Sequence, residues 1–575
     1  MYRFLLCGLS SAMNKLFFVS VGVGYLCLFS SLWLNKTILM DFCLVSLNCL
    51  SVNFCLMFDE VSLMFVGAVL VISGSVGIYS SWYMDDEKFF LRFMFLILLF
   101  VGSMVSLILI PNLICLMLGW DGLGLVSFLL VCYYQNNKSL SAAMVTAITN
   151  RVGDVLILVC VGMLSVYGDW VFYKRYDFCF SLFMSVMFVV AGMTKSAQIP
   201  FSAWLPAAMA APTPVSSLVH SSTLVTAGVY LLIRGFWVLE PNSQSLDLLK
   251  IASLLTLLMA GMVALMEVDF KKVIALSTLS QLGVMMFCLS MKLPYVAFFH
   301  LITHATFKAL LFVSAGCVIH SNSGNQDLRS LSKCWEELPV SMSFLSVASF
   351  SLAGVPFMSG FFSKDLIIEL SLMSCDNFVI YVLMMVGVSF TSWYMLRVFM
   401  SVAVGNNKKA VISSWSKESS SVVVSYVCLF FCAVFSGWVI SSKFKLVFFS
   451  TFIDTWLFLT ICFIPLYGVF LFLFMVSLHP LPWLPRVSKF IISMWNFKLL
   501  SSQFLIMPGM LNCYKISRCM DQGWLEMVGP QGVYSVLSKS SQKNQLIQSW
   551  YFLFLLGSLL LCLSVSVMIV LFFLS

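Results

Sequence analysis

Residues 294–319 decide the class of fold, and they read PYVAFFHLITHATFKALLFVSAGCVI. The run is long enough for one bilayer-crossing helix, which needs ~20 mostly apolar residues. It nevertheless contains His300, His304 and Lys308, three ionisable groups that are costly at bilayer depth. Because four-residue steps turn a helix by only ~40°, the three side chains share one face. The stretch therefore predicts a membrane-spanning helix whose ionisable face has a functional role.

The composition of the whole chain is that of a polytopic membrane protein. Of its 575 residues, 61% are apolar and 10% are Asp, Glu, Lys or Arg, whereas a soluble domain has about 25% charged residues. This balance excludes soluble enzymes and disordered chains. The net charge of +8 is thinly spread, without the blocks of like charge that nucleic-acid binding needs. We expect an all-α, multi-pass protein that contacts lipid and no nucleic acid.

The 19 cysteines predict neither a metal site nor a cluster. No C-x-x-C pair occurs, and Cys43, Cys49 and Cys55 recur at a spacing of six residues, which matches no zinc or iron–sulfur site. Small buried apolar residues are the simpler interpretation. The abundance of Phe, Met and Cys also indicates a compositionally biased genome, as in organelles.

The hydropathy pattern predicts roughly fifteen spans. They are 16–34, 60–82, 89–110, 112–133, 139–166, 178–210, 215–239, 247–267, 271–290, 294–319, 340–375, 378–402, 422–441, 453–477 and 549–573. Segments 178–210 and 340–375 are too long for one crossing and contain Pro or Gly, so we expect broken helices, which membranes tolerate where the freed backbone is buried or lines a cavity. No secretory signal is expected, because residues 1–14 are too short to hold one.

Two stretches are expected outside the bilayer. Between Asp41 and Phe58 polar residues recur with a period nearer 2 than 3.6, which predicts a short β-hairpin. Residues 486–545 mix charged and apolar side chains, which predicts an amphipathic segment along the membrane surface, interrupted near Gly529-Pro530. A flexible linker is the alternative for this segment.

Further charges fall inside the first predicted spans. Asp121 lies about ten residues into its helix, ~15 Å deep. Lys195 lies five residues before Pro200 in the first broken segment, where carbonyls freed by prolines are available to a buried ammonium or to water. Arg151 and Asp154 stand at i and i+3 and can pair across one turn. That pair has two interpretations, a functional site or a self-neutralised structural bridge.

The later spans continue the series. His220 lies just after a Pro-Thr-Pro run, Lys364 and Asp365 follow a break at Val355-Pro356, and Arg397 comes toward the end of its span. Imidazoles exchange protons near neutral pH, and a nearby carboxylate raises the proton affinity of a buried lysine. The set therefore indicates a proton path. Zinc is the alternative for the paired histidines of 294–319, but the set lacks a third ligand and the Glu of H-E-x-x-H.

Several of these motifs resemble the antiporter-like subunits of respiratory complex I. The resemblance is dense from about residue 112 to 402 and is carried by Gly119–Gly124 (GWDGLG), Asn150–Asp154 (NRVGD), Gly192–Gln198 (GMTKSAQ), Pro212–Thr223 (PTPVSSLVHSST), His300–Lys308 and Gly360–Asp365 (GFFSKD). It implies two inverted five-helix repeats, each with one broken helix, and such pairing marks transport sites near the midplane.

The resemblance also implies roles along a horizontal file of polar residues and water. Asp121 and Lys195 become the first-half ion pair, and Lys364 with Asp365 the second-half terminus. His220 and Lys308 become central relays with His304 near them. The supporting residues are Arg151, Asp154 and His300.

The expected organisation has six segments. They are N-terminal spans with a hairpin (1–110), a first antiporter-like repeat (111–239), a second repeat (240–402), additional spans (403–485), an amphipathic lateral helix that braces neighbouring antiporter-like subunits (486–545), and a final membrane anchor (546–575). Two departures from the family matter: Asp121 stands where Glu is usual, and the first helix of the family is reduced to a stub before residue 16.

The resemblance implies proton translocation as one membrane-arm subunit of an NADH:ubiquinone reductase in the mitochondrial inner membrane. This chain is expected to bind no cofactor, because it has no G-x-G-x-x-G in a strand–turn–helix setting and no cluster spacing. NADH, FMN, iron–sulfur clusters and ubiquinone would belong to other subunits. Two rival functions are a subunit of an Mrp-type cation/proton antiporter and a scaffold whose charges are inert bridges.

Overall fold

Apolar helices make up nearly the whole structure, as the hydropathy predicts. The computed structural model describes residues 2–34, 36–47, 50–85, 87–168, 170–171, 181–374, 377–405, 418–444, 467–468, 470, 484–497, 500 and 505–574. The chain divides into two units, Met1–Lys498 and Leu499–Ser575. Twelve helices in the described ranges are long and apolar enough to cross a membrane. The predicted span 453–477 lies almost wholly outside those ranges.

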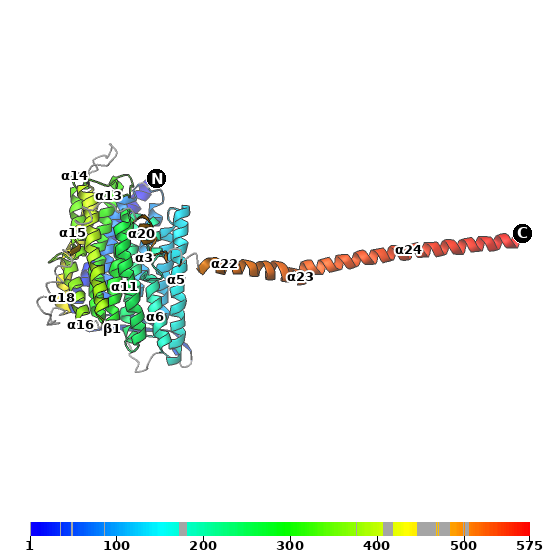
Figure 1. The fold of residues 1–575 in the computed structure, drawn as a ribbon, viewed down its shortest axis with the longest axis horizontal. Coiled ribbons are helices and arrows are strands. Elements are labelled where there is room, and N and C mark those ends of the chain that lie inside the picture. The colour runs from blue at the N-terminus through cyan, green and yellow to red at the C-terminus, as the bar shows by residue number, and fades with distance from the viewer. Residues whose placement is uncertain are drawn as a thin grey trace. The chain divides into compact units, whose positions relative to one another are not determined.

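The long helices of the first unit run side by side (Figure 1). Its elements are α1 (Tyr2–Trp33), β1 (Ile38–Leu47), β2 (Leu50–Phe58), α2 (Glu60–Tyr83), α3 (Phe90–Leu109), α4 (Leu113–Val131), α5 (Asn137–Leu164), η1 (Ser165–Tyr167), α6 (Leu182–Lys195), α7 (Trp204–Ala207), η2 (Ala208–Ala210), α8 (Thr213–Val215), η3 (Ser216–Thr223), α9 (Leu224–Arg234), α10 (Phe236–Leu239), α11 (Ser243–Met266), α12 (Phe270–Ser290), α13 (Pro294–Ser321), α14 (Cys334–Glu337), α15 (Pro339–Ala353), α16 (Ser359–Ser374), α17 (Phe378–Phe399), η4 (Met400–Val404), α18 (Ser420–Lys443) and α20 (Leu484–Ile492).

Both broken helices are confirmed. Helix α6 ends at Lys195 and is followed by turns before the short α7 and η2. Helix α15 ends at Ala353, Gly354 takes a left-handed conformation (φ 86°), and α16 starts at Ser359. A proline follows the end of each broken helix, Pro200 after α6 and Pro356 after α15, and proline lacks the N–H that continues a helix. At the second break Gly354 also adopts a positive φ without strain.

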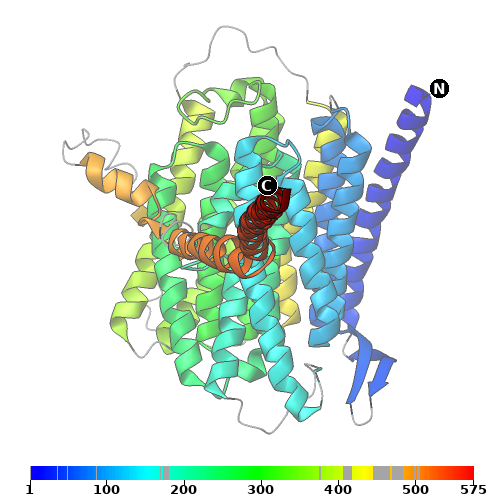
Figure 2. The same ribbon diagram turned by 90° about the vertical axis from the view of Figure 1, so that its right-hand side faces the viewer.

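The predicted hairpin is also confirmed. Strands β1 and β2 pair antiparallel, with Ile38 opposite Phe58 and Leu47 opposite Leu50. The hairpin lies at one end of the helices of the first unit (Figure 2). Before it, α1 runs as one helix from Tyr2, so the residues before position 16 are not a separate stub. They extend the first helix, whose candidate membrane span is Ala12–Trp33.

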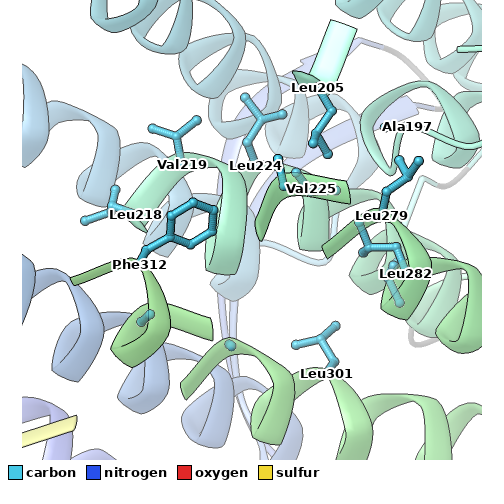
Figure 3. Close-up of a cluster of buried hydrophobic side chains, with 14 of the residues drawn as sticks. Ala197, Leu205, Leu218, Val219, Leu224, Val225, Leu279, Leu282, Leu301 and Phe312 are labelled. Atoms are coloured by element: carbon cyan, nitrogen blue, oxygen red, sulfur yellow. The ribbon is translucent and has the colours of Figure 1, made fainter. Parts of the chain in front are cut away.

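Helices α12 and α13 form the centre of the first unit. In the most apolar stretch of each of these two helices all residues are buried, whereas in the corresponding stretch of α5 only 33% of the residues are buried. Figure 3 shows how the space around them is filled by side chains such as Leu218 and Val219 of η3, Leu279 of α12 and Phe312 of α13. His300, His304 and Lys308 of α13 are therefore enclosed by protein.

The start of α2 is tied to the end of α9 by a buried ion pair. Asp59 caps α2, accepting a hydrogen bond from the Ser62 backbone N–H at 2.7 Å. The guanidinium of Arg234 donates to both oxygens of the same carboxylate, at 2.6 and 2.8 Å, and its Nε donates to Tyr230 Oη at 2.8 Å. Burial alone would raise the pKa of Asp59, but hydrogen bonds from Arg234 and its positive charge outweigh that effect and hold the pKa below its ordinary value.

The second unit consists of α22 (Leu505–Ile516), η7 (Ser517–Leu525), α23 (Glu526–Val528) and α24 (Pro530–Leu574). The predicted interruption at Gly529-Pro530 is confirmed, since α23 ends and α24 begins there. Helix α24 continues through residue 545, where a lateral helix is predicted to give way to a membrane anchor, and that boundary stays a prediction. No Gly or Pro occurs from 533 to 556, so nothing in the sequence breaks the helix.

We predict that Asp59→Asn destabilises the protein by about 3–5 kcal/mol, because Asn still caps a helix while Arg234 keeps an uncompensated buried charge. The measurement is thermal denaturation of the purified assembly. Since the folded-state pKa of Asp59 is lowered, its contribution is present above the ordinary pKa of Asp and is lost as the pH falls through the lowered one. The matched control is Asp247→Asn, whose side chain is 63% exposed in a pair with Lys250. Equal melting temperatures for both variants would contradict the assignment.

Candidate functional site

Four side chains of α4 and α5 form the first charged cluster. Nη1 of Arg151 lies 3.2 Å from Oδ2 of Asp154 and 3.7 Å from Oδ2 of Asp121. The indole N–H of Trp120 donates to Oδ1 of Asp154 at 2.8 Å. The predicted pairing of Arg151 with Asp154 is therefore present, and Asp121 joins it. One cation neutralises only part of the charge of two carboxylates.

Lys195, at the end of α6, does not pair directly with Asp121, contrary to the prediction. Its side chain is buried, its Nζ donates to the backbone carbonyl of Trp120 at 2.7 Å, and the same Nζ lies 3.7 Å from the centre of the Trp120 ring. A carbonyl and an aromatic face both stabilise a desolvated ammonium. Trp120 therefore stands between the cation and Asp154, touching Lys195 with its ring and Asp154 with its N–H.

His220 lies in η3, which is a π-helix. π-Helical segments are rare in proteins overall, but many of those that occur lie at functional sites. The side chain is 1% exposed, and its ring centre lies 6.3 Å from that of Trp204. Neither ring nitrogen makes a hydrogen bond of normal geometry, although the backbone of Ala208 lies beside it. Buried imidazoles normally find partners, so water is expected to complete the bonding of this ring.

His300, His304 and Lys308 of α13 are all buried, and His300 and Lys308 contact two neighbouring helices. Lys308 donates to Ser277 Oγ of α12 at 2.5 Å. His300 lies 3.2 Å from Gln281 Oε1 of α12 and 2.9 Å from Ser363 Oγ of α16. Because Ser277 and Gln281 are one helical turn apart, α12 presents matching polar groups to the face that α13 turns toward it.

His304 lies between those two residues and has no partner. It is 0% exposed, its ring centre is 6.3 Å from that of His300, and neither nitrogen is hydrogen-bonded to protein. An unsatisfied buried polar group costs about 1–3 kcal/mol. A polar site of this kind is where buried water is expected.

Lys364 is held by the second helix break. Its Nζ donates to Thr391 Oγ1 of α17 at 2.6 Å and to the Leu352 carbonyl at 3.5 Å. In an unbroken helix that carbonyl would accept from the N–H of residue 356, which is a proline. The break thus supplies an acceptor for the ammonium.

Asp365, which is expected to form the second-half terminus together with Lys364, makes no direct ion pair with it, and the joint role stays a prediction. Asp365 is half-buried and acts on Lys364 only through space. Successive residues on a helix point about 100° apart, so neighbours in sequence do not face each other. Arg397 is structural, because it donates to the carbonyls of Ala264, Leu265 and Glu267 at the end of α11.

Sequence reasoning missed the neutral partners of the lysines. Trp120, Ser277 and Thr391 each accept from, or lie against, a buried ammonium. Trp120 carries a signal, since it stands inside a motif next to a charged residue. The two hydroxyls carry none, because Ser and Thr are common in every span. Within the described ranges no three His, Cys, Asp or Glu side chains are placed to hold a metal ion.

The arrangement as a whole is a series of titratable groups, most of them enclosed by protein, with Asp121 and Arg151 at its start 38% and 58% exposed. It begins at the charged cluster of α4 and α5 and continues through Lys195, His220, Lys308 and Lys364. Amines and imidazoles can each accept and release one proton. With water between them, such groups can pass protons along the unit.

Comparison with sequence families covers most of the chain. The profile described as NADH:quinone oxidoreductase/Mrp antiporter, TM, matches residues 111–391. The profiles for the complex I chain 5 N-terminus and the NADH dehydrogenase subunit 5 C-terminus match residues 44–94 and 394–572. The charged cluster and all of the buried series lie within the first of these matches.

Individual relatives agree with the profiles. The NADH-ubiquinone oxidoreductase chain 5 of Mytilus edulis is 50% identical over 536 residues, covering 92% of this chain and 94% of that protein. The protein of the same name from Lumbricus terrestris is 42% identical over 516 residues, with coverage of 88% and 89%. Both alignments span nearly the full length of each chain.

Two solved structures share the fold. A chain of the Mrp complex from a Dietzia species superposes with a TM-score of 0.76 at 24% identity, over 88% of this chain and 58% of that chain. A chain of the membrane-bound sulfane sulfur reductase, an archaeal respiratory membrane complex, gives 0.66 at 17% identity, over 76% and 91%.

Proposed function

Because the chain belongs to the chain 5 family of NADH–ubiquinone oxidoreductase, complex I, we propose that it moves protons across the membrane as one membrane-arm subunit of that enzyme. The observation that carries the proposal is His304. It is fully buried between His300 and Lys308 and has no protein partner. A structural histidine would be satisfied by protein, whereas a relay histidine must bond to exchangeable water.

The first half of the path works through the charge beside Lys195. Asp154 touches the lysine only through Trp120. Arg151 contacts both carboxylates of the cluster. When Arg151 neutralises Asp154, less negative charge acts on the ammonium and the proton of Lys195 is released more readily. When Arg151 moves away, the negative charge of Asp154 acts on Lys195 again, and the lysine takes up a proton. The step changes one proton at Nζ and needs no other chemistry.

The second half works through repulsion between cations. Lys364 interacts electrostatically with both His300 and Lys308. Like charges in a poorly solvated interior disfavour one another. A proton arriving at Lys308 therefore promotes release from Lys364, and the pair passes protons one at a time rather than holding two.

Energy for these movements would come from redox chemistry elsewhere in the complex. We assign NADH, FMN, the iron–sulfur clusters and ubiquinone to other subunits, and the complex to the mitochondrial inner membrane. This chain would contribute no redox step. Its part is to hold and move protons in response to charge and conformational changes at its borders.

A neighbouring subunit is assigned to the face formed by α4 and α5. Asp121 and Arg151 line a cavity of about 240 Å³ on that face, and their side chains are 38% and 58% exposed. Exposed charges within membrane spans are costly against lipid, so another protein chain should cover them. We assign residues 486–545 to bracing of antiporter-like neighbours, and the exposed apolar surface of α24 to contact with lipid or those neighbours.

An Mrp-type antiporter subunit is the second candidate function. The fold shared with a chain of the Mrp complex favours the antiporter function. The full-length match to chain 5 proteins favours the function in the respiratory complex. Sodium transport by the purified protein would support the antiporter. An inert scaffold is disfavoured, because buried ammonium groups without carboxylates are poor structural choices.

We predict that Lys195→Ala and Lys308→Ala each lower coupled quinone reduction and proton pumping by about tenfold or more, because each removes one proton-carrying group from a single series. The measurement is proton uptake per electron in reconstituted complex whose assembly has been verified. The control is Lys333→Ala, an exposed lysine paired with Glu336 at 3.7 Å. Wild-type pumping in both relay variants would refute the proposed path.

We predict that Asp121→Glu leaves turnover and pumping within about twofold of the wild type, a difference of only ~0.4 kcal/mol. The side chain lines a cavity of about 240 Å³ that has room for one more methylene, and its carboxylate already stands 3.7 Å from Arg151. Steady-state NADH:quinone turnover is the measurement. An inactive but assembled variant would mean that the cluster requires the shorter acid.

A further inference from the structure

Lys271 is a buried lysine that the path described above does not use. It is the second residue of α12 and is 5% exposed. Its Nζ donates to the backbone carbonyl of Ala211 at 2.8 Å. None of the carboxylates that the structure describes forms an ion pair with it, whereas the next residue, Lys272, is paired with Asp269. Two adjacent lysines therefore have opposite environments.

The carbonyl that holds Lys271 is made available by prolines. Residues 212 and 214 are prolines and offer no N–H. The N–H groups of Val215 and Ser216 both donate to Pro212 rather than to Ala211. The Ala211 carbonyl is therefore free of helical bonding, and a free buried carbonyl is a ready acceptor for an ammonium. At the second helix break, the Leu352 carbonyl is freed by Pro356 in the same way and accepts from Lys364.

Lys271 and His220 share one neighbour on the inner side of α12. Both residues lie against the short segment 208–211, with His220 beside the backbone of Ala208 and Lys271 bonded to Ala211. Helix α12 packs against η2 and η3, which carry that segment and His220. The charge of Lys271 acts on the His220 ring, and neither nitrogen of that ring is satisfied by a protein hydrogen bond of normal geometry.

The outer side of Lys271 is the end of the helical bundle. The N–H of Phe270 donates to Gln326 at 2.8 Å, and the N–H of Leu328 donates to Val268 at 3.0 Å. These bonds close a loop over the start of α12. The side chains of Asp269 and Lys272 in the same turn are 36% and 41% exposed. Lys271 thus lies between a water-exposed turn and a buried relay histidine.

We propose that Lys271 is the proton access group that connects His220 with one surface of the membrane. In the transfer an Nζ–H bond of the ammonium breaks, the proton passes through water to a ring nitrogen of neutral His220, and imidazolium forms. The neutral amine then takes a proton from hydronium at the exposed turn. The inference rests on the proposed function, since it adds an access route to the same path.

Arginine at position 271 separates this role from a purely structural one. It keeps the positive charge and can donate to the Ala211 carbonyl, but its guanidinium cannot be deprotonated in a protein. If Lys271 only ties α12 to the 208–211 segment, Lys271→Arg restores function. If Lys271 passes protons, the arginine blocks the route.

The experiment compares Lys271→Arg, Lys271→Met, Lys272→Met and Lys308→Met in the intact, reconstituted complex. We expect both position-271 variants to assemble and to lose about tenfold or more in proton pumping, while Lys272→Met stays near the wild type. Wild-type pumping by Lys271→Arg would overturn the access role. If Lys308→Met is impaired while Lys271→Arg pumps normally, only the access role fails. If Lys308→Met also pumps normally, the proposed function itself fails.

Discussion

The cost of burying an ammonium group in membrane-spanning helices is the constraint on which the structure depends. Even lenient scales put it at ~2.5–3.5 kcal/mol for one charge at the centre of a span. Lys195, Lys308 and Lys364 are nevertheless buried and bonded to neutral acceptors. A carboxylate at close range would stabilise the charge more, but it would also hold the proton more tightly. Neutral acceptors leave each lysine able to release it.

Prolines supply further neutral acceptors by freeing backbone carbonyls. A continuous helix uses all its central carbonyls internally. Where Pro356 removes an N–H, the Leu352 carbonyl becomes available to Lys364. Where Pro212 and Pro214 do so, the Ala211 carbonyl accepts from Lys271. The prolines therefore help to stabilise buried charge, because each carbonyl that they free lowers the free-energy cost of burying the nearby ammonium group.

Much of this could be predicted from the sequence. Apolar runs of bilayer length predicted the spans, and Pro or Gly inside overlong runs predicted both breaks, because these signals are local. The face shared by His300, His304 and Lys308 followed from helix geometry. The partner of Lys195 could not be predicted, because Trp120 and Asp121 are adjacent and only packing decides which one faces α6. The predicted boundary near residue 545 rests on a change in polarity, which does not end a helix, and α24 is continuous there.

Proton transfer along these buried groups requires water that joins them into one conducting series, and an experimental density map of the assembled complex that resolves ordered water is the decisive measurement. We predict water within hydrogen-bonding distance of both ring nitrogens of His304, continuing without a gap from Lys195 to Lys364. A dry, protein-packed space around His304, with no water on either side of it, would refute proton transfer along the series.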